Sequence, residues 1–419
     1  MTPDRREALR TLGALTAGAA LTRLDVPHLT PAAISDAQAP VADFPRKADF
    51  NLDPAETYIN GAYTHPMPRA AAAAANAFTM RRTTAQPAGA GAARDVARRA
   101  FASLINAKPS EVSLVPNTST AENLVVECLG LARNEGNVVS DLLHFDGALI
   151  HLMELQKRGL DLRLAKPTRD GRILMKDLEA LVDRKTRLVE VSLVSWYNGF
   201  QHDLKAVCDL AHAHGAFVYA DVIQGAGAVP FDVRAAGVDF AACSTYKWLM
   251  GDFGLGFLYV REELLGTVIQ RPHWSYESTS DSDIHLSPFD PRSATPVTWT
   301  AGTDAATIFE LGTMASGVAA ALGVSIPYVQ QLGVERIQAH RQPMLAKLQA
   351  ELPRLGFTPQ TPAGSTSPIV TFAHDREADI NRRFARARIN VRVAPYWMRI
   401  SPSIYNDMHD VERLLEALG

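Results

Sequence analysis

After residue 46 the chain alternates short, almost entirely apolar runs with longer amphipathic stretches. The apolar runs predict strands and the amphipathic stretches predict helices, a pattern typical of βαβ units around a mainly parallel sheet. The predicted strands are residues 112–115, 137–140, 187–194, 217–220, 240–243 and 256–260. The predicted helices are residues 92–105, 121–131, 149–157, 204–214 and 410–418. The sequence therefore predicts an α/β fold.

The same pattern predicts how the chain is divided. Residues 1–45 are rich in Ala, Gly and Pro and predict a leader outside the folded core. Residues 271–299 are rich in Ser, Asp, Pro and aromatic side chains and predict a long irregular loop, which in a compact domain tends to be functional. Beyond residue 304 the chain becomes helical and then mixed, so we expect a second, smaller domain over residues 305–419.

Composition narrows the class of ligand. Of the 419 residues, 47% are hydrophobic, which allows a sizeable core. The formal net charge is only −3, so there is no electrostatic case for nucleic acid or an anionic membrane, and a small molecule is the expected ligand. The three cysteines, Cys128, Cys208 and Cys243, stand in apolar runs without the pair spacing of a metal site, and we expect them in the core.

The leader resembles a twin-arginine export signal. Arg5 and Arg6 precede a mildly apolar run over residues 11–21, which is too short to span a bilayer permanently. Asp4 and Ala8 depart from the usual pattern, so a cytosolic extension is the alternative. The resemblance implies a partner, the twin-arginine machinery, and a periplasmic rather than cytoplasmic location. Because that route carries folded proteins, a cofactor can be inserted before export.

Two charges stand where strands end. Asp221 follows the apolar run 217–220, and Lys247 comes just beyond the next run, 240–243. Ligands of open α/β sheets bind at the carboxyl ends of strands, and an unpaired buried carboxylate is costly. Pyridoxal 5'-phosphate (PLP) needs a lysine to hold its aldehyde as a Schiff base and an acid facing its pyridine nitrogen. The pair therefore suggests a PLP site, with a turn acid and a solvated surface lysine as the alternatives.

A candidate phosphate site lies earlier in the chain. Thr118 and Ser119 stand between the predicted strand 112–115 and the predicted helix 121–131. Hydroxyls and free N–H groups at a helix N-terminus attract phosphate. A plain Ser/Thr helix cap is the alternative.

The Thr118-Ser119 segment, Asp221 and Lys247 follow one another in the order typical of the class V aminotransferase family of fold-type I PLP enzymes. With the opening segment from Tyr58 to Pro66, the chain resembles this family over nearly everything after residue 55. Its isopenicillin N epimerase-like or kynureninase-like branch fits best. The resemblance implies a large PLP-binding domain over residues 65–304 with a mainly parallel seven-stranded sheet, and a smaller α+β domain over residues 305–419. Residues 46–64 are then expected to pack on the small domain.

The resemblance also implies roles for residues around the cofactor. Phe145 matches the ring that stacks on the pyridine, with His144 one position away as the alternative and a simple core Phe as another. Gln224 matches the residue that hydrogen-bonds the phenolic oxygen. Ser244 would contact the phosphate. Tyr246 stands where histidine is usual and can still donate a hydrogen bond.

Substrate and partner contacts are implied in the same way. Arg399 matches the arginine that holds the substrate α-carboxylate in a bidentate fork. Asn60 and Trp196 are candidate substrate contacts, although Trp196 could equally pack. Thr303 matches a threonine that reaches the phosphate in the neighbouring subunit, which implies a homodimer. No metal is implied.

Cysteine desulfurases carry a nucleophilic cysteine on the loop before this arginine, and residues 389–398 contain none. The resemblance therefore predicts that the chain is not a cysteine desulfurase. Transamination or epimerisation of an amino acid or amine-bearing peptide, by Schiff-base and quinonoid chemistry with Lys247 as general base, is expected instead. The alternatives are a lyase or tailoring enzyme acting on a siderophore-type peptide, and a non-catalytic PLP-fold binding protein. A nicotinamide-dependent oxidoreductase is disfavoured because no Gly-x-Gly-x-x-Gly turn follows the first strand.

Overall fold

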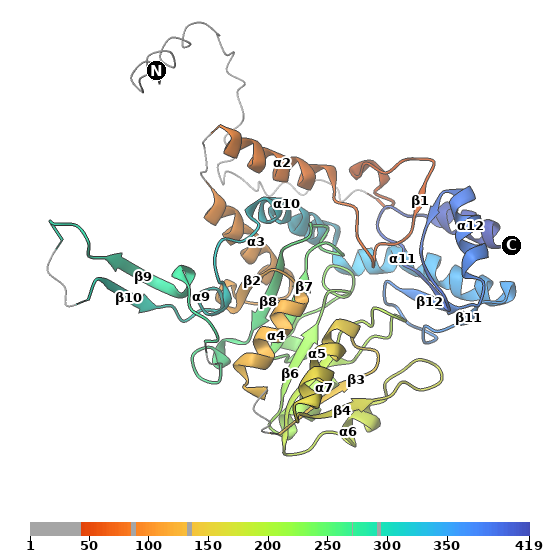
Figure 1. Cartoon of the computed structure of the whole chain (residues 1–419). Helices are drawn as coiled ribbons and strands as arrows, with labels where there is room; N and C mark the ends of the chain where they lie inside the picture. Colours follow the sequence, from red (N-terminus) through yellow and green to blue (C-terminus); the bar gives the residue numbers. More distant parts are fainter. Residues whose placement is uncertain (1–42, 85–88, 132–135, 270, 291–294) are drawn as a thin grey trace, which may run out of the picture. The chain divides into compact units, whose positions relative to one another are not determined.

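The computed structural model describes residues 43–84, 89–131, 136–269, 271–290 and 295–419, so the leader's two arginines lie outside the described residues. The largest element is a seven-stranded sheet in the order β2-β8-β7-β6-β5-β3-β4 (Figure 1). Strand β8 runs antiparallel to both neighbours, and the other pairs are parallel. The strands are β2 (Val112–Val115), β3 (Asn137–Asp141), β4 (Asp161–Ala165), β5 (Thr186–Ser192), β6 (Phe217–Asp221), β7 (Phe240–Ser244) and β8 (Gly256–Val260). The predicted fold class is confirmed.

Helices cover both faces of this sheet, which is why its strands are nearly continuous apolar runs. Successive side chains of a strand point to opposite faces. Val138 belongs to the apolar cluster that also contains side chains of α4 (Thr118–Cys128), α5 (Asp146–Lys157) and α9 (Ala305–Phe309). Val139 belongs to the cluster on the other face, which contains side chains of α3 (Ala90–Leu104), α7 (Leu204–Ala213) and α10 (Ser316–Leu332). The other α-helices among the described residues before residue 300 are α2 (Arg69–Thr83), α6 (Met175–Glu179) and α8 (Val233–Ala236).

A second, antiparallel sheet lies near the C-terminus in the order β11-β12-β15-β14. Its strands are β11 (Thr358–Pro359), β12 (Val370–Ala373), β14 (Arg392–Ala394) and β15 (Trp397–Ile400). Its own apolar core includes side chains of α11 (Val334–Glu351), α12 (Glu377–Ala387) and α13 (Met408–Leu418). The segment before α2 reaches this part of the chain, because β1 (Thr57–Tyr58) pairs in parallel with β13 (Ile389–Asn390). Helices α9 and α10, beyond the predicted boundary at residue 304, share the core of the large sheet instead.

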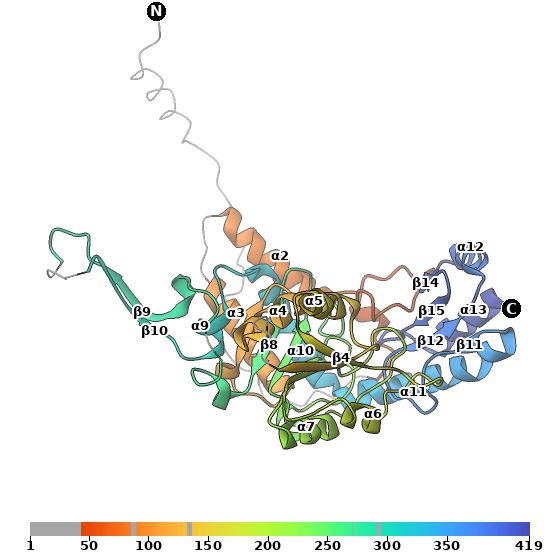
Figure 2. The same ribbon diagram turned by 60° about the horizontal axis from the view of Figure 1, so that its bottom comes forward.

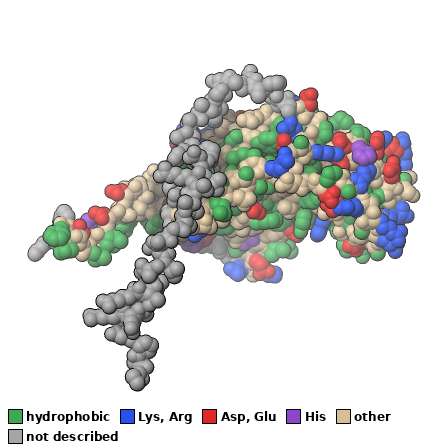
Figure 3. Space-filling view, turned by 90° about the horizontal axis from the view of Figure 1, so that it is seen from above, with side chains coloured by type: hydrophobic (Ala, Val, Ile, Leu, Met, Phe, Trp, Pro, Cys, Tyr) green, Lys and Arg blue, Asp and Glu red, His purple; other side chains and the backbone are tan. Residues whose placement is uncertain are grey.

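The prediction of a long irregular loop over residues 271–299 is wrong. Strands β9 (Thr279–Ile284) and β10 (Val297–Ala301) form an antiparallel hairpin that projects from the rest of the described chain (Figure 2). Both strands are largely exposed. Strand β9 is mostly polar and gives no apolar pattern, whereas the residues of β10 alternate between apolar and polar over only five positions. Apolar side chains gather on the hairpin (Figure 3), where Ile284, Leu286 and Phe289 are exposed.

Within the described residues, no single helix is long and apolar enough to cross a membrane, although the bent pair Ser316–Leu332 and Val334–Leu355 passes that test of length and composition when taken together.

Candidate active site

Two adjoining cavities lie at the carboxyl ends of β6 and β7. One has a volume of about 380 Å³ and the other about 290 Å³. Lys247, Phe145, Tyr246 and Phe253 line both. The larger cavity also contains Asp221 and the N-terminus of α4, so we call it the cofactor cavity. The smaller one also contains Arg399, and we call it the substrate cavity.

Asp221 and Lys247 meet in the cofactor cavity. Asp221 is the last residue of β6, and its Oδ1 accepts a 2.9 Å hydrogen bond from Ile223 N. Burial raises the pKa of Asp221, although the nearby His144 opposes the shift. Burial and the charge of Arg399 lower the pKa of Lys247 to about 8, which makes its neutral, nucleophilic amine accessible near physiological pH. An acid and an amine face the same cavity, as PLP requires.

The N-terminus of α4 is fixed against the lysine segment by a reciprocal pair of hydrogen bonds. Thr118 N donates to Ser244 Oγ over 2.9 Å, and Ser244 N donates to Thr118 Oγ1 over 3.0 Å. Gly256 permits this close approach, since a Cβ there would lie 3.3 Å from the Asn117 Cα. Thr118, Ser119 and Ser244 line the cavity, so hydroxyls and the helix dipole converge where an anion is favoured.

Phe145 and His144 take different positions. Phe145 precedes α5 and lines both cavities. His144 is buried and does not line them, because its Nδ1 lies 2.7 Å from Ser192 Oγ and its Nε2 lies 3.3 Å from Glu190 Oε1. The geometry therefore offers Phe145, rather than His144, to a ring bound in the cofactor cavity.

Arg399 reaches the substrate cavity from β15. Its Nη1 donates a 2.6 Å hydrogen bond to the carbonyl oxygen of Trp196, and its Nε has no partner among the described residues. Burial, with the nearby charge of Arg392, lowers the pKa of Arg399 to about 10, so it stays charged at neutral pH. Trp196 lines the same cavity, and its ring meets that of Phe145 edge-on at 6.1 Å.

Two expected contacts, Gln224 and Asn60, lie outside the cavities, and Thr303 was expected to act only in a neighbouring subunit. Gln224 is buried outside the cavities, because its Nε2 donates to Ala62 O and its Oε1 accepts from Trp248 Nε1. Asn60 donates to Asn390 Oδ1 over 3.1 Å and lines neither cavity. Thr303 is exposed just beyond β10 and lines neither cavity of its own chain, so its predicted role in a neighbouring subunit stays a prediction.

The sequence reasoning missed other residues of the substrate cavity, namely Tyr63, Phe253 and Arg392. Arg392 stands seven positions before Arg399, and its role depends on a tight turn that brings β14 back against β15. Only the alternation of the two short strands could have indicated that both arginines share one face.

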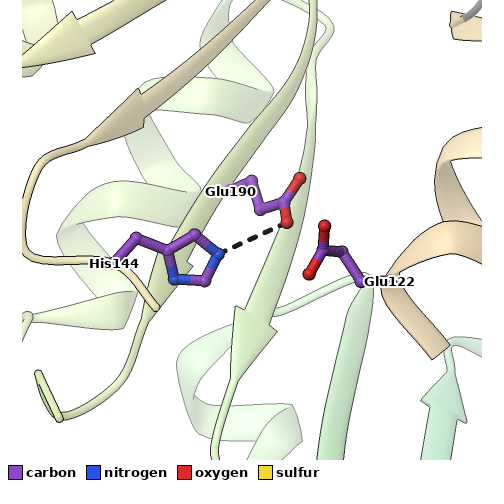
Figure 4. Close-up of side chains that lie close together, drawn as sticks. All are labelled: Glu122, His144 and Glu190. Atoms are coloured by element: carbon purple, nitrogen blue, oxygen red, sulfur yellow. Dashed lines mark hydrogen bonds and ion pairs between the residues drawn. The ribbon is translucent and has the colours of Figure 1, made fainter. Parts of the chain in front are cut away.

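A buried charge cluster behind the cofactor cavity was also missed. Donor atoms of Glu122, His144 and Glu190 lie within 4.8 Å of one another, close enough to hold a metal ion. Figure 4 shows the His144 ring directed at Glu190, with Glu122 on the far side of that carboxylate. Burial and the charge of Glu190 raise the pKa of Glu122 to about 7. The cluster sits close to Asp221, since Ser192, the partner of His144, is paired in register with Asp221.

The fold and cavities define a PLP site of fold type I, and comparison with known proteins agrees. The model of the family described as Aminotransferase class-V matches residues 69–414, and the chain belongs to this family. Its members use PLP, and PLP is the cofactor of this protein. The donors described above fit that group.

The chain is similar to proteins named for sulfur chemistry. A "Probable cysteine desulfurase" of Methanothermobacter thermautotrophicus is 32% identical over 256 residues, 61% of this chain and 60% of the relative. A "Cysteine desulfurase" of Escherichia coli O6:K15:H31 is 28% identical over 344 residues, 77% of this chain and 80% of the relative. The match spans about 60% of the length of the first two curated relatives.

The fold is also that of a solved complex between the cystine C-S lyase C-DES and its reaction product, cysteine persulfide. The TM-score is 0.76 at 21% identity, covering 87% of this chain and 97% of that one.

These relatives overturn the expectation that the chain is not a cysteine desulfurase, and with it transamination or epimerisation as the expected reaction. The prediction was wrong because the absence of one cysteine excludes only one way of accepting the sulfur. A thiol on the loop before Arg399 is one acceptor for sulfur, and residues 389–398 lack it. Breaking the carbon–sulfur bond is a separate step from accepting the sulfur, so the missing thiol does not exclude it.

Proposed function

We propose that the protein is a PLP-dependent enzyme that breaks the Cβ–S bond of cysteine or of an S-substituted cysteine such as cystine. Two observations support this. Lys247 and Arg399 line the same 290 Å³ cavity, and the curated relatives are named cysteine desulfurases. The shared cavity supports proton removal at Cα, because a lysine can reach an α-proton whose carboxylate is held beside it. The names of the relatives carry the choice of the Cβ–S bond.

The cofactor cavity assigns the groups that would hold PLP. Lys247 Nζ would hold the aldehyde, and Asp221 would face the ring nitrogen. Phe145 would cover one face of the ring, and Thr118 and Ser244 would donate to the phosphate. When bound, PLP supplies an electron sink for the pair released at the substrate Cα.

The chain's own side chains orient the substrate and move its proton. Arg399 would bind the α-carboxylate through its free Nε and Nη2 positions, since Nη1 is held by Trp196 O. Lys247 would take the proton from Cα, and its lowered pKa of about 8 suits a base working near neutrality. The rings of Trp196, Tyr246 and Phe253 line this cavity and limit the water that reaches Cα.

Sulfur leaves without a thiol of the enzyme. All three cysteines are buried and none lines either cavity. With cystine, loss of the Cα proton and of the Cβ–S electron pair gives cysteine persulfide, and the remaining fragment with one water gives pyruvate and ammonia. With cysteine, an external thiol would accept the sulfur as a persulfide and leave alanine.

A direct test is sulfur release by the holoenzyme, measured as sulfide from L-cysteine in the presence of a reducing thiol and as persulfide from L-cystine in its absence, because the thiol would itself reduce cystine to cysteine. We expect release with the wild type and with the surface variant Lys176→Ala, and none with Lys247→Ala. The proposal fails if the yellow wild-type holoenzyme releases no sulfur from either compound.

We also propose that two copies of the chain complete each site, as the family resemblance suggests for Thr303. The hairpin before Thr303 carries exposed apolar side chains, which a second copy would cover. Light scattering should give a dimer mass. A hybrid dimer of one Thr303→Val subunit and one Lys247→Ala subunit separates the two possibilities. If Thr303 acts across the interface, the site with Lys247 receives an intact Thr303 from the other subunit and stays active. If Thr303 acts within its own subunit, that site carries the valine and loses activity.

Two further predictions concern branch and location. The substitution of Phe145 for the usual histidine supports an isopenicillin N epimerase-like or kynureninase-like branch of the family. The Arg5-Arg6 pair supports twin-arginine export to the periplasm. A folded reporter fused to residues 1–45 should reach the periplasm with the native pair and stay behind when both arginines are replaced by lysine.

A further inference from the structure

Arg392 and Arg399 are direct partners across the antiparallel pair β14–β15. Both line the substrate cavity. Like charges directly opposite each other on neighbouring strands destabilise a sheet. Within the described part of the chain, no carboxylate forms an ion pair with either guanidinium. Two uncompensated positive charges therefore face one cavity, and an anionic ligand would relieve their repulsion.

The two arginines differ in depth. Arg399 is 3% exposed and held by Trp196 O, as expected for a group that fixes the reacting end of a substrate. Arg392 is exposed at the mouth of the cavity. Its guanidinium lies over the rings of Tyr63 and Trp397, at 5.6 Å and 5.9 Å from their centroids. These contacts orient the charge and leave its N–H donors free.

We propose that Arg392 binds a second carboxylate at the far end of the substrate, so that the site prefers dicarboxylic amino acids. The inner arginine then takes the α-carboxylate and the outer one the distal carboxylate. If the proposed function holds, the preferred sulfur compound is cystine, which carries an α-carboxylate at each end. The identity of that compound rests on the proposed function, whereas the preference for a second carboxylate does not.

The competing arrangement is that both guanidiniums bind one carboxylate. It predicts no gain from a distal charge, because the outer arginine would already be satisfied. The two arrangements are separated by ligands of equal length that differ only at the far end. L-2-aminoadipate and L-norleucine are such a pair, since the first ends in a carboxylate where the second ends in a methyl group, and neither has a carbon–sulfur bond to break.

The test is a titration of the holoenzyme with each amino acid, followed through the visible absorption band of the cofactor. We expect the wild type to bind L-2-aminoadipate about 10- to 100-fold more tightly than L-norleucine, the gain from one hydrogen-bonded ion pair. Arg392→Gln should abolish that preference and leave the affinity for L-norleucine within about twofold. Arg392→Lys should keep part of the preference. Arg386→Gln, which removes an exposed arginine outside the cavities, should keep all of it.

Equal affinity of the wild type for the two ligands, or an unchanged preference in Arg392→Gln, would overturn the inference. The wild-type comparison does not depend on any variant folding. A clear preference combined with no sulfur release would leave the second carboxylate site intact and overturn only the proposed desulfuration.

Discussion

Thr118 and Ser244 exchange hydrogen bonds, each backbone N–H donating to the other residue's hydroxyl oxygen, at 2.9 Å and 3.0 Å. The two residues are far apart in the sequence, one opening α4 and the other ending β7. The exchange fixes the phosphate-binding end of the cofactor cavity relative to Lys247, three positions further along the chain. A cofactor held at both its phosphate and its aldehyde needs this distance to be fixed.

Thr118→Val removes one hydroxyl while keeping the side-chain shape. It leaves Ser244 N without its acceptor and takes one donor from the cofactor cavity, so the dissociation constant for PLP should rise about tenfold. Dialysis followed by measurement of bound cofactor checks this. Glu127→Gln, an exposed change near the C-terminal end of α4, is the matched control and should bind PLP normally. An unaltered PLP affinity in Thr118→Val would show that the exchange does not hold the cofactor.

The cysteines should be dispensable for turnover. Burial raises the pKa of Cys128 and of Cys208 to about 12, and it raises that of Cys243 further, so none is a thiolate near neutral pH. Single Cys→Ala variants should release sulfur from cystine at rates within about threefold of the wild type, since none of the thiols touches the cavities. A thiol reagent should label the native protein slowly and the unfolded protein at all three positions. Loss of sulfur release in a folded Cys243→Ala variant would contradict a thiol-free route.

The buried cluster should make stability depend on pH. Burial alone would lower the pKa of His144, but the hydrogen bond and charge of Glu190 raise it to about 9. Since the ordinary value is 6.5, the protonated ring stabilises the fold fully below about pH 6.5, and this stabilisation is lost as the pH rises through about 9. Its size is on the order of 3 kcal/mol in the apoprotein.

Glu190→Gln removes the charge and should flatten this dependence relative to the wild type. Glu179→Gln, on the surface of α6, should leave it unchanged. Urea unfolding of the three apoproteins at mildly acidic and at alkaline pH measures the effect. If wild type and Glu190→Gln lose equal stability across that range, His144 is neutral in the native protein.

Much of the large domain could be predicted because its strands are buried on both faces. The strand predicted over residues 112–115 has the same first and last residue as β2, and all four of its side chains are buried. The hairpin β9–β10 was not predicted, because the exposed Thr, Ser and Asp side chains of β9 give no apolar pattern and the alternation in β10 covers only five residues. The sequence pattern also does not predict that α10, which lies beyond residue 304, packs on the large sheet, because that pattern describes only residues close together in the chain.

The site divides in the same way. Asp221 and Lys247 could be placed because each follows a readable strand. Gln224 could not, since its amide is taken up by the buried Trp248 N–H, a contact between residues 24 positions apart. Arg392 was missed because its position opposite Arg399 depends on the register of two very short strands.

The most direct test of the central claim is the fate of the carbon skeleton of L-cystine in the presence of the holoenzyme, followed by mass spectrometry. Cleavage of the Cβ–S bond predicts pyruvate free of sulfur together with cysteine persulfide, with both products absent in Lys247→Ala. A keto acid that still carries its sulfur, or cystine inverted at Cα with no sulfur released, would contradict the account.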